Sequence, residues 1–186
     1  MYNPMEKSFM NLTPTEFEQF SLDLLKEQTN NLPNVKFEHN KIIKTHDGNY
    51  QIDGYIEFEL MSVIYRTIVE CKHYKESISR EKVQVLNGKI ESIGAQKGIL
   101  ISSSNFQKGA REYAEIHGIA LIQLTEAMTS YEMRANIGVI VASGRKPFNH
   151  GKPYMGVLVK NSGNLGSVSC SYLCSSKNEL EKFLLE

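Results

Sequence analysis

Two neighbouring stretches of alternating polar and apolar residues constrain the fold of this chain more than any other feature. Residues 51–60 read QIDGYIEFEL, and residues 63–72 read VIYRTIVECK. Side chains of a β-strand point alternately to its two faces, and β-branched and aromatic residues favour strands. The two stretches therefore predict adjoining strands that form a hairpin.

The alternation also predicts which side chains share a face. The expected apolar face carries Ile52, Ile56, Phe58, Leu60, Val63, Tyr65, Val69 and Cys71, and the opposite face carries Asp53, Glu57, Glu59, Arg66, Glu70 and Lys72. Asp53, 17 residues before Glu70, thus comes to the same polar face as Glu70 and Lys72.

This trio suits metal-assisted cleavage of a phosphodiester. Residues i and i+2 of a strand project in parallel, about 6.6 Å apart, so a cation at Glu70 lies within reach of a water held by Lys72. Mg²⁺ prefers oxygen ligands and is typically held by one or two carboxylates plus substrate phosphates. Asp53 and Glu70 supply the carboxylates, and the Lys72 ammonium orients the water or neutralises developing charge.

At these residues the chain resembles a known family. Asp53, Glu70 and Lys72 match the D…E-x-K core of the PD-(D/E)xK phosphodiesterases. Four further stretches are similar to the Mrr-type restriction endonuclease catalytic domain, a relative of archaeal Holliday junction resolvases: LTPTEFE at 12–18, DGNYQID at 47–53, ECKHY at 70–74, and GILIS at 98–102 followed by Phe106 and Ala110. The resemblance covers about 115 residues of the chain, from residue 10 to residue 125.

The resemblance implies a restriction-endonuclease-like α/β fold, a mixed sheet flanked by helices. It implies a Mg²⁺-dependent DNA endonuclease of restriction or defence type, with Mn²⁺ as a substitute metal. Asp53 and Glu70 would be metal ligands, Lys72 the catalytic lysine, and Glu18 of the first helix an auxiliary catalytic residue. Gln84 is the nearest match to a glutamine that family members carry in the helix after the E-x-K strand.

The remaining pattern agrees with this order of elements. A capping box from Thr13 to Glu16 with Pro14 begins a helix over 13–29, and a strand follows at 35–44. Helices are expected from Ser79 to Gly94 and from Asn105 to His117, and short apolar strands at 97–102 and 119–124. The sequence thus predicts one catalytic domain over residues 1–127.

Residues 128–186 have a different texture and predict a small β-rich unit with a terminal helix. Strands are expected at 137–141, 154–160 and 167–173, and Ser176 caps the helix. This stretch matches no family known to us. It is expected to pack on the first domain or on a partner, and an interaction or sensor role coupled to the nuclease is one hypothesis.

The charge balance argues against a large basic surface. The chain has 21 Lys and Arg and 21 Asp and Glu, so its formal net charge is zero, whereas a protein that grips a polyanion is usually basic. Basic residues do follow the site, and Lys89 is among those that would line a phosphate track. The candidate DNA contacts are His73, Lys75, Arg80, Lys82 and Gln84.

Several classes of function lack their motifs. No P-loop, G-x-G-x-x-G or G-x-S-x-G sequence occurs, and three cysteines without CxxC spacing favour reduced thiols. No apolar run is long enough to span a membrane, so a cytoplasmic protein is expected. Two alternatives stay open: a DNA- or junction-binding module that does not cut, and a two-fold homodimer that cuts both strands.

Overall fold

The computed structural model describes residues 11–29, 32–126, 154–162, 167–173 and 179–185. Its elements in chain order are α1 (Pro14–Gln28), β1 (Lys36–Lys44), β2 (Asn49–Leu60), β3 (Val63–Lys72), α2 (Arg80–Ile93), β4 (Lys97–Ser102), α3 (Lys108–Ile116), β5 (Ile119–Glu126), β6 (Tyr154–Ser162), β7 (Ser167–Leu173) and α5 (Glu179–Leu185). The described strands form one seven-stranded sheet in sequence order. β3, β4 and β5 run parallel, and the other neighbours are antiparallel.

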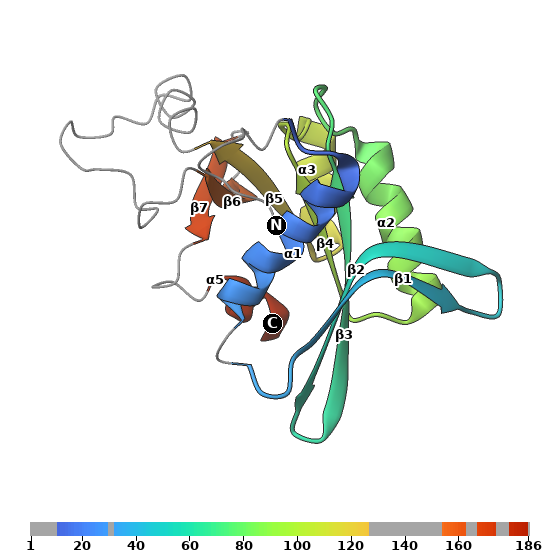
Figure 1. Ribbon diagram of the computed structural model, residues 1–186. Coiled ribbons are helices and arrows are strands. Elements are labelled where there is room, and N and C mark those ends of the chain that lie inside the picture. The colour runs from blue at the N-terminus through green and yellow to red at the C-terminus, as the bar shows by residue number, and fades with distance from the viewer. Residues whose placement is uncertain (1–10, 30–31, 127–153, 163–166, 174–178, 186) are drawn as a thin grey trace.

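The helices cover both faces of this sheet (Figure 1). α1 and α5 pack on one face, where Phe17, Leu25, Ile56, Val69, Ile101, Leu180 and Leu184 belong to one buried cluster. α2 and α3 pack on the other, where Ile52, Tyr55, Ile68, Val83, Leu86, Leu100 and Ala110 form a second. The expected mixed sheet flanked by helices is confirmed, and the site strands lie between two cores.

The predicted hairpin is present, with β2 and β3 paired from Gly54 and Val69 to Leu60 and Val63. Its expected polar face is covered only in part. α2 and α3 pack there and bury Tyr55 and Ile68, and Glu70 is also buried, whereas Glu59 and Arg66 are exposed. Val63, expected on the apolar face, is 54% exposed because it lies at the hairpin end.

The alternation of β2 is interrupted at Asp53. Ile52 belongs to the cluster beneath α2, whereas Ile56, four residues later, belongs to the cluster beneath α1. Strict alternation would have placed both on one face, as the sequence pattern predicted. The opposite strand is also irregular, since Asn40 between the pairs His39–Gly54 and Lys41–Ile52 has a φ of 52°. The irregularity thus lies where β2 carries the first site carboxylate.

The helix ends were predicted well in two cases and wrongly in one. The Thr13–Glu16 capping box is present, and Gly94 ends α2 in the left-handed conformation with a φ of 69°. The third helix begins at Lys108 and not after Asn105. The Asn105 carbonyl instead accepts a hydrogen bond from Ile78 N–H at 2.8 Å, beside an isolated β-bridge between Ile78 and Phe106.

The C-terminal strands continue the main sheet, because β6 pairs with β5. Leu158 of β6 and three residues of α5, namely Leu180, Phe183 and Leu184, are buried in the α1 cluster. The strands expected at 154–160 and 167–173 are thereby confirmed. The expected boundary between residues 127 and 128, the strand at 137–141 and the Ser176 cap lie outside the described residues.

Candidate active site

Glu70 is the centre of the candidate site and lies near the end of β3. Its side chain points toward α2 and is only 7% exposed. Lys72 projects from the same strand face, and its Nζ donates to Glu70 Oε2 at 2.8 Å. The predicted parallel projection of these two residues is therefore confirmed.

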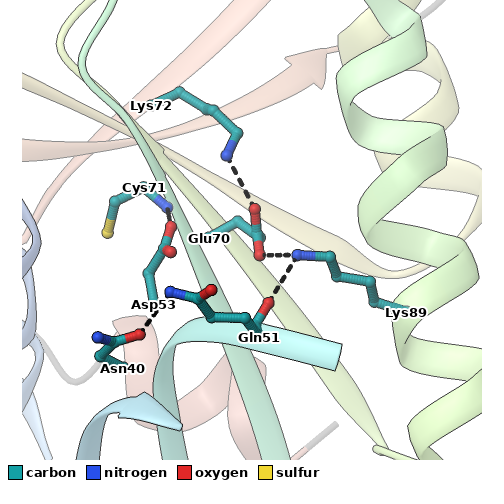
Figure 2. A network of polar contacts seen from close by, with 7 residues as sticks. All are labelled: Asn40, Gln51, Asp53, Glu70, Cys71, Lys72 and Lys89. Carbon is teal, nitrogen blue, oxygen red and sulfur yellow. Dashed lines mark hydrogen bonds and ion pairs between the residues drawn. The ribbon is translucent and has the colours of Figure 1, made fainter. Parts of the chain in front are cut away.

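A second lysine reaches the same carboxylate from the neighbouring helix. Lys89 of α2 donates to Glu70 Oε1 and, at 3.0 Å, to the main-chain carbonyl of Gln51 (Figure 2). Both oxygens of a nearly buried carboxylate are thus paired with ammonium groups, which offsets the cost of burying its charge. The sequence had placed Lys89 only among the basic residues that follow the site.

Asp53 lies on β2 next to the last described β2–β3 pair, Gly54 with Val69. Its Oδ2 accepts a hydrogen bond from the main-chain N–H of Cys71 at 2.7 Å, so the carboxylate takes a strand N–H next to Glu70 (Figure 2). Asp53 is thereby held beside Glu70 by a contact that the chain's backbone makes.

The electrostatics of the site reflect two carboxylates in a partly buried place. Burial raises the pKa of Asp53 above its usual 3.8, and the charge of Glu70 raises it further, against the N–H of Cys71 and the charge of Lys72. Burial by itself would lower the pKa of Lys72, but the charge of Glu70 and its hydrogen bond raise that pKa above 10.5. Lys72 is therefore an ammonium at neutral pH, and Asp53 carries a charge that its surroundings do not fully stabilise.

Glu18 of α1, which the resemblance implied as an auxiliary catalytic residue, contacts His39. Its Oε2 lies 2.8 Å from Nε2 of His39 on β1, and both side chains are partly buried. The charge of Glu18 also contributes to raising the pKa of Asp53. His39 was given no role from the sequence, and no spacing rule would have found it, because the pair forms only when α1 packs across β1.

Gly54 explains how α1 comes so close to the site. A Cβ built on Gly54 would lie 2.4 Å from Cδ2 of Leu22 and 3.1 Å from Cβ of Val69. A larger residue here would have to displace the Leu22 side chain, so glycine favours the close packing of α1 on β2. The glycine next to Asp53 therefore helps α1 to pack near the site strands.

His73 and Cys71 flank the lysine of the E-x-K strand. The His73 ring stacks on Phe17 with centroids 4.6 Å apart, and its Nδ1 is buried with no hydrogen-bond partner in the described part of the chain. Burial raises the pKa of the Cys71 thiol well above its usual value, with the charge of Asp53 adding to it. Cys71 is a free thiol in the core, as predicted, and not an activated nucleophile.

The other predicted DNA contacts are spread along the chain after β3. Lys75, Arg80 and Gln84 are exposed, and Lys82 is half-buried. The Arg80 guanidinium lies 5.1 Å from the centre of the Tyr113 ring. On α2 it is Lys89, five residues after Gln84, that contacts the carboxylate of the E-x-K strand. Contact of these residues with DNA stays a prediction.

The residues present fit a divalent cation as a site of two carboxylates. Nowhere in the described ranges do three His, Cys, Asp or Glu side chains gather closely enough to hold a metal by themselves. Mg²⁺ does not require three, since it keeps several waters and takes substrate phosphate oxygens as ligands. Burial and the charge of Glu70 disfavour the charged form of Asp53, and a cation held by Asp53 and Glu70 would offset both effects.

Comparison with known proteins places these residues in a family. The model of Mrr_cat, a restriction endonuclease family, matches residues 9–131. This chain belongs to that family. The matched range contains α1 to β5 and every site residue named above, and membership confirms the restriction-endonuclease-like fold.

The individual relatives share only a small part of their sequence with this chain. The type IV methyl-directed restriction enzyme EcoKMrr of Escherichia coli K12 is 24% identical over 117 residues, which are 62% of this chain and 37% of that enzyme. The chain thus aligns with little more than a third of that relative. Two solved structures are similar to part of the fold.

The crystal structure of AF1548, a protein of unknown function, has a TM-score of 0.49 at 18% identity and covers 59% of this chain and 57% of its own. The DNA modification-dependent restriction endonuclease AspBHI has a TM-score of 0.41 at 17% identity and covers 65% of this chain and 33% of its own.

No helix in the described ranges is both long and apolar enough to cross a bilayer.

Proposed function

We propose that this Mrr_cat domain is a Mg²⁺-dependent DNA endonuclease that hydrolyses phosphodiester bonds in a restriction or defence system. The observation that carries the proposal is the convergence of Asp53, Glu70 and Lys72 at one end of the β2–β3 hairpin. Membership of a restriction endonuclease family supports DNA as the substrate. A cytoplasmic location, where a cell meets foreign DNA, is part of the proposal.

The carboxylates of Asp53 and Glu70 would hold the metal, with Mn²⁺ as a substitute for Mg²⁺. The bound ion would act as a Lewis acid on the phosphate and lower the pKa of a bound water. Glu18, paired with His39, would add a further negative charge near the metal from α1. Asp53 and Glu70 would thus act as metal ligands. Other groups would transfer protons and stabilise the charge that develops on the phosphate.

Lys72 would stabilise the charge that develops on the phosphate. In the metal-free protein the charge of Glu70 keeps the pKa of Lys72 above 10.5. The ammonium would donate hydrogen bonds to the phosphate or orient the attacking water. His73, Lys75, Arg80, Lys82 and Gln84 would contact the DNA strand beyond the site. The modest positive charge of this set predicts modest affinity and a shallow dependence on salt.

The test is nicking of supercoiled plasmid, methylated and unmethylated, by the full chain after dialysis against EDTA. We expect cleavage only after Mg²⁺ or Mn²⁺ is added, and its loss in Asp53→Asn and Lys72→Met. Matched controls are Asp23→Asn and Lys108→Met, which remove the same charges at exposed ion pairs on α1 and α3. Cleavage retained by both site variants while they stay folded would end the proposal.

One observation favours a second function, binding of DNA or a branched junction without cleavage. Both oxygens of Glu70 are paired with lysines, so the site is stabilised without a metal. Salt-dependent binding of junction and duplex probes, with no metal-dependent hydrolysis over long incubation, would support this function.

The nuclease proposal has two further parts. Residues 128–186 would engage a partner, and the protein would assemble as a two-fold dimer that cuts both strands.

A further inference from the structure

Lys89 occupies the kind of position that a hard cation would take. Its Nζ contacts a carboxylate oxygen of Glu70 on β3 and the carbonyl oxygen of Gln51 on β2, at 3.0 Å for the latter. The lysine side chain is only 20% exposed, and Glu70 is 7% exposed. Carboxylate and main-chain carbonyl oxygens are the ligands that divalent cations such as Mg²⁺ and Ca²⁺ use.

The two lysines of the site divide the carboxylate between them. Lys72 is paired with Oε2 of Glu70 and Lys89 with Oε1 (Figure 2). Each of these oxygens keeps a second lone pair for a metal, but a third positive charge at one carboxylate is repelled by both ammonium groups. Metal binding at Glu70 is therefore favoured when one of the two lysines leaves, or turns from, its oxygen.

Lys89 is the lysine that we expect to leave. It reaches the site from α2 on a long flexible stem, so its head can swing to solvent while the helix stays in place. Lys72 shares its strand with Glu70, and the charges of Glu70 and Asp53 both hold it there. Its departure would also remove the proposed catalytic ammonium.

We propose that Lys89 is the internal counter-ion of Glu70, and that a divalent cation displaces it from Oε1 when the metal binds. This inference rests on the proposed metal site at Asp53 and Glu70. Lys89 is a positioning residue that holds Glu70 in the absence of metal. Its presence lowers the affinity for the ion, since each binding event must break the Lys89–Glu70 pair.

The experiment measures Mn²⁺ binding to the full chain by EPR of the free ion, without DNA. The variants are Lys89→Met, Asp53→Asn and a matched control, Lys41→Met. Lys41 is a partly buried lysine on β1 that pairs with Glu38 and lies 3.6 Å from the centre of the Tyr55 ring. We expect Lys89→Met to bind Mn²⁺ about tenfold more tightly than the wild type, and Lys41→Met to stay within about twofold.

Thermal melting gives a second readout that a surface lysine would not affect. Without metal, Lys89→Met should melt below the wild type, because the nearly buried Glu70 loses a partner. With saturating Mn²⁺ this gap should close, because the ion then replaces the ammonium in both proteins.

The outcomes separate the two proposals. If the wild type binds Mn²⁺ and Asp53→Asn does not, the metal site stands, and a Lys89→Met affinity equal to or weaker than wild type overturns the inference about Lys89. If the wild type binds no Mn²⁺, or Asp53→Asn binds it equally well, the metal site itself is refuted and the inference falls with it.

Discussion

Replacing Glu70 by Gln tests how the site is stabilised without metal. The substitution keeps the size of the side chain but removes the charge that pairs with Lys72 and Lys89. One amide oxygen remains as an acceptor and the amide nitrogen is a donor, so one ammonium loses its contact with this side chain. We expect Glu70→Gln to lower the free energy of unfolding of the metal-free protein.

The magnitude follows from the contacts. Hydrogen bonds to charged groups contribute about 1.5–3 kcal/mol each, and removing one partner of a buried ion pair costs about 3–5 kcal/mol. Lys72 and Lys89 keep 21% and 20% of their side chains exposed, so each regains part of its hydration by rotating outward. After this discount we expect a loss of about 2–3 kcal/mol.

Urea unfolding followed by circular dichroism measures the change. The matched control is Glu112→Gln on α3, whose partner Lys108 is 71% exposed at 3.6 Å. Exposed pairs of this kind contribute about 0–1 kcal/mol. In the double variant Glu70→Gln with Lys89→Met, the loss should be smaller than the sum of the two single losses, since both remove the same interaction.

A Glu70→Gln protein as stable as the wild type, or more stable, would refute this reasoning. It would mean that the cost of desolvating Glu70, Lys72 and Lys89 is at least as large as the free energy of their attraction. Additive losses in the double variant would show that Glu70 and Lys89 do not interact in solution.

Two further predictions concern the strand that carries Asp53. Gly54→Ala should lower the free energy of unfolding by about 1–3 kcal/mol, because the added methyl group overpacks against Leu22. The control is Gly88→Ala on α2, whose Cβ meets nothing within 4 Å and which should raise the free energy of unfolding by about 0.5–1 kcal/mol. Equal effects of the two substitutions in urea unfolding would contradict this prediction. Because the pKa of Asp53 is raised above 3.8, the folded protein binds that proton more tightly than the unfolded chain, so the stability linked to it is complete at acidic pH and lost as pH rises through the raised pKa. The free energy of unfolding of the wild type minus that of Asp53→Asn should therefore fall as the pH rises from the usual pKa of 3.8 through the raised pKa. A rise over that range would show that the folded protein stabilises the Asp53 carboxylate.

The part of the site that lies on the hairpin could be predicted from the sequence, because strand periodicity is local. Glu70 and Lys72 are two residues apart, so their common direction follows from the alternation alone. The sequence also assigned Asp53 to the site. It did not reveal the irregularity of β2 at Asp53, which places Ile52 and Ile56 in different cores.

The partners that complete the site could not be predicted, because they depend on how helices pack on the sheet. Lys89 reaches Glu70 from 19 residues away, and His39 reaches Glu18 from 21 residues away. The prediction that Asn105 caps the third helix was wrong for a related reason. The main chain next to Asn105 forms a β-bridge between Ile78 and Phe106 instead. Tertiary contacts override local signals at each of these positions.

The pairing of β6 with β5 has a practical consequence for dissecting this protein. A chain cut near residue 126 would leave the outer edge of β5 without its hydrogen-bond partners and would uncover the core that Leu158 and α5 close. Exposed strand edges and apolar surface promote aggregation. Loss of cleavage by such a fragment would report misfolding, so any signalling role of the C-terminal strands has to be sought by point substitution in the intact protein.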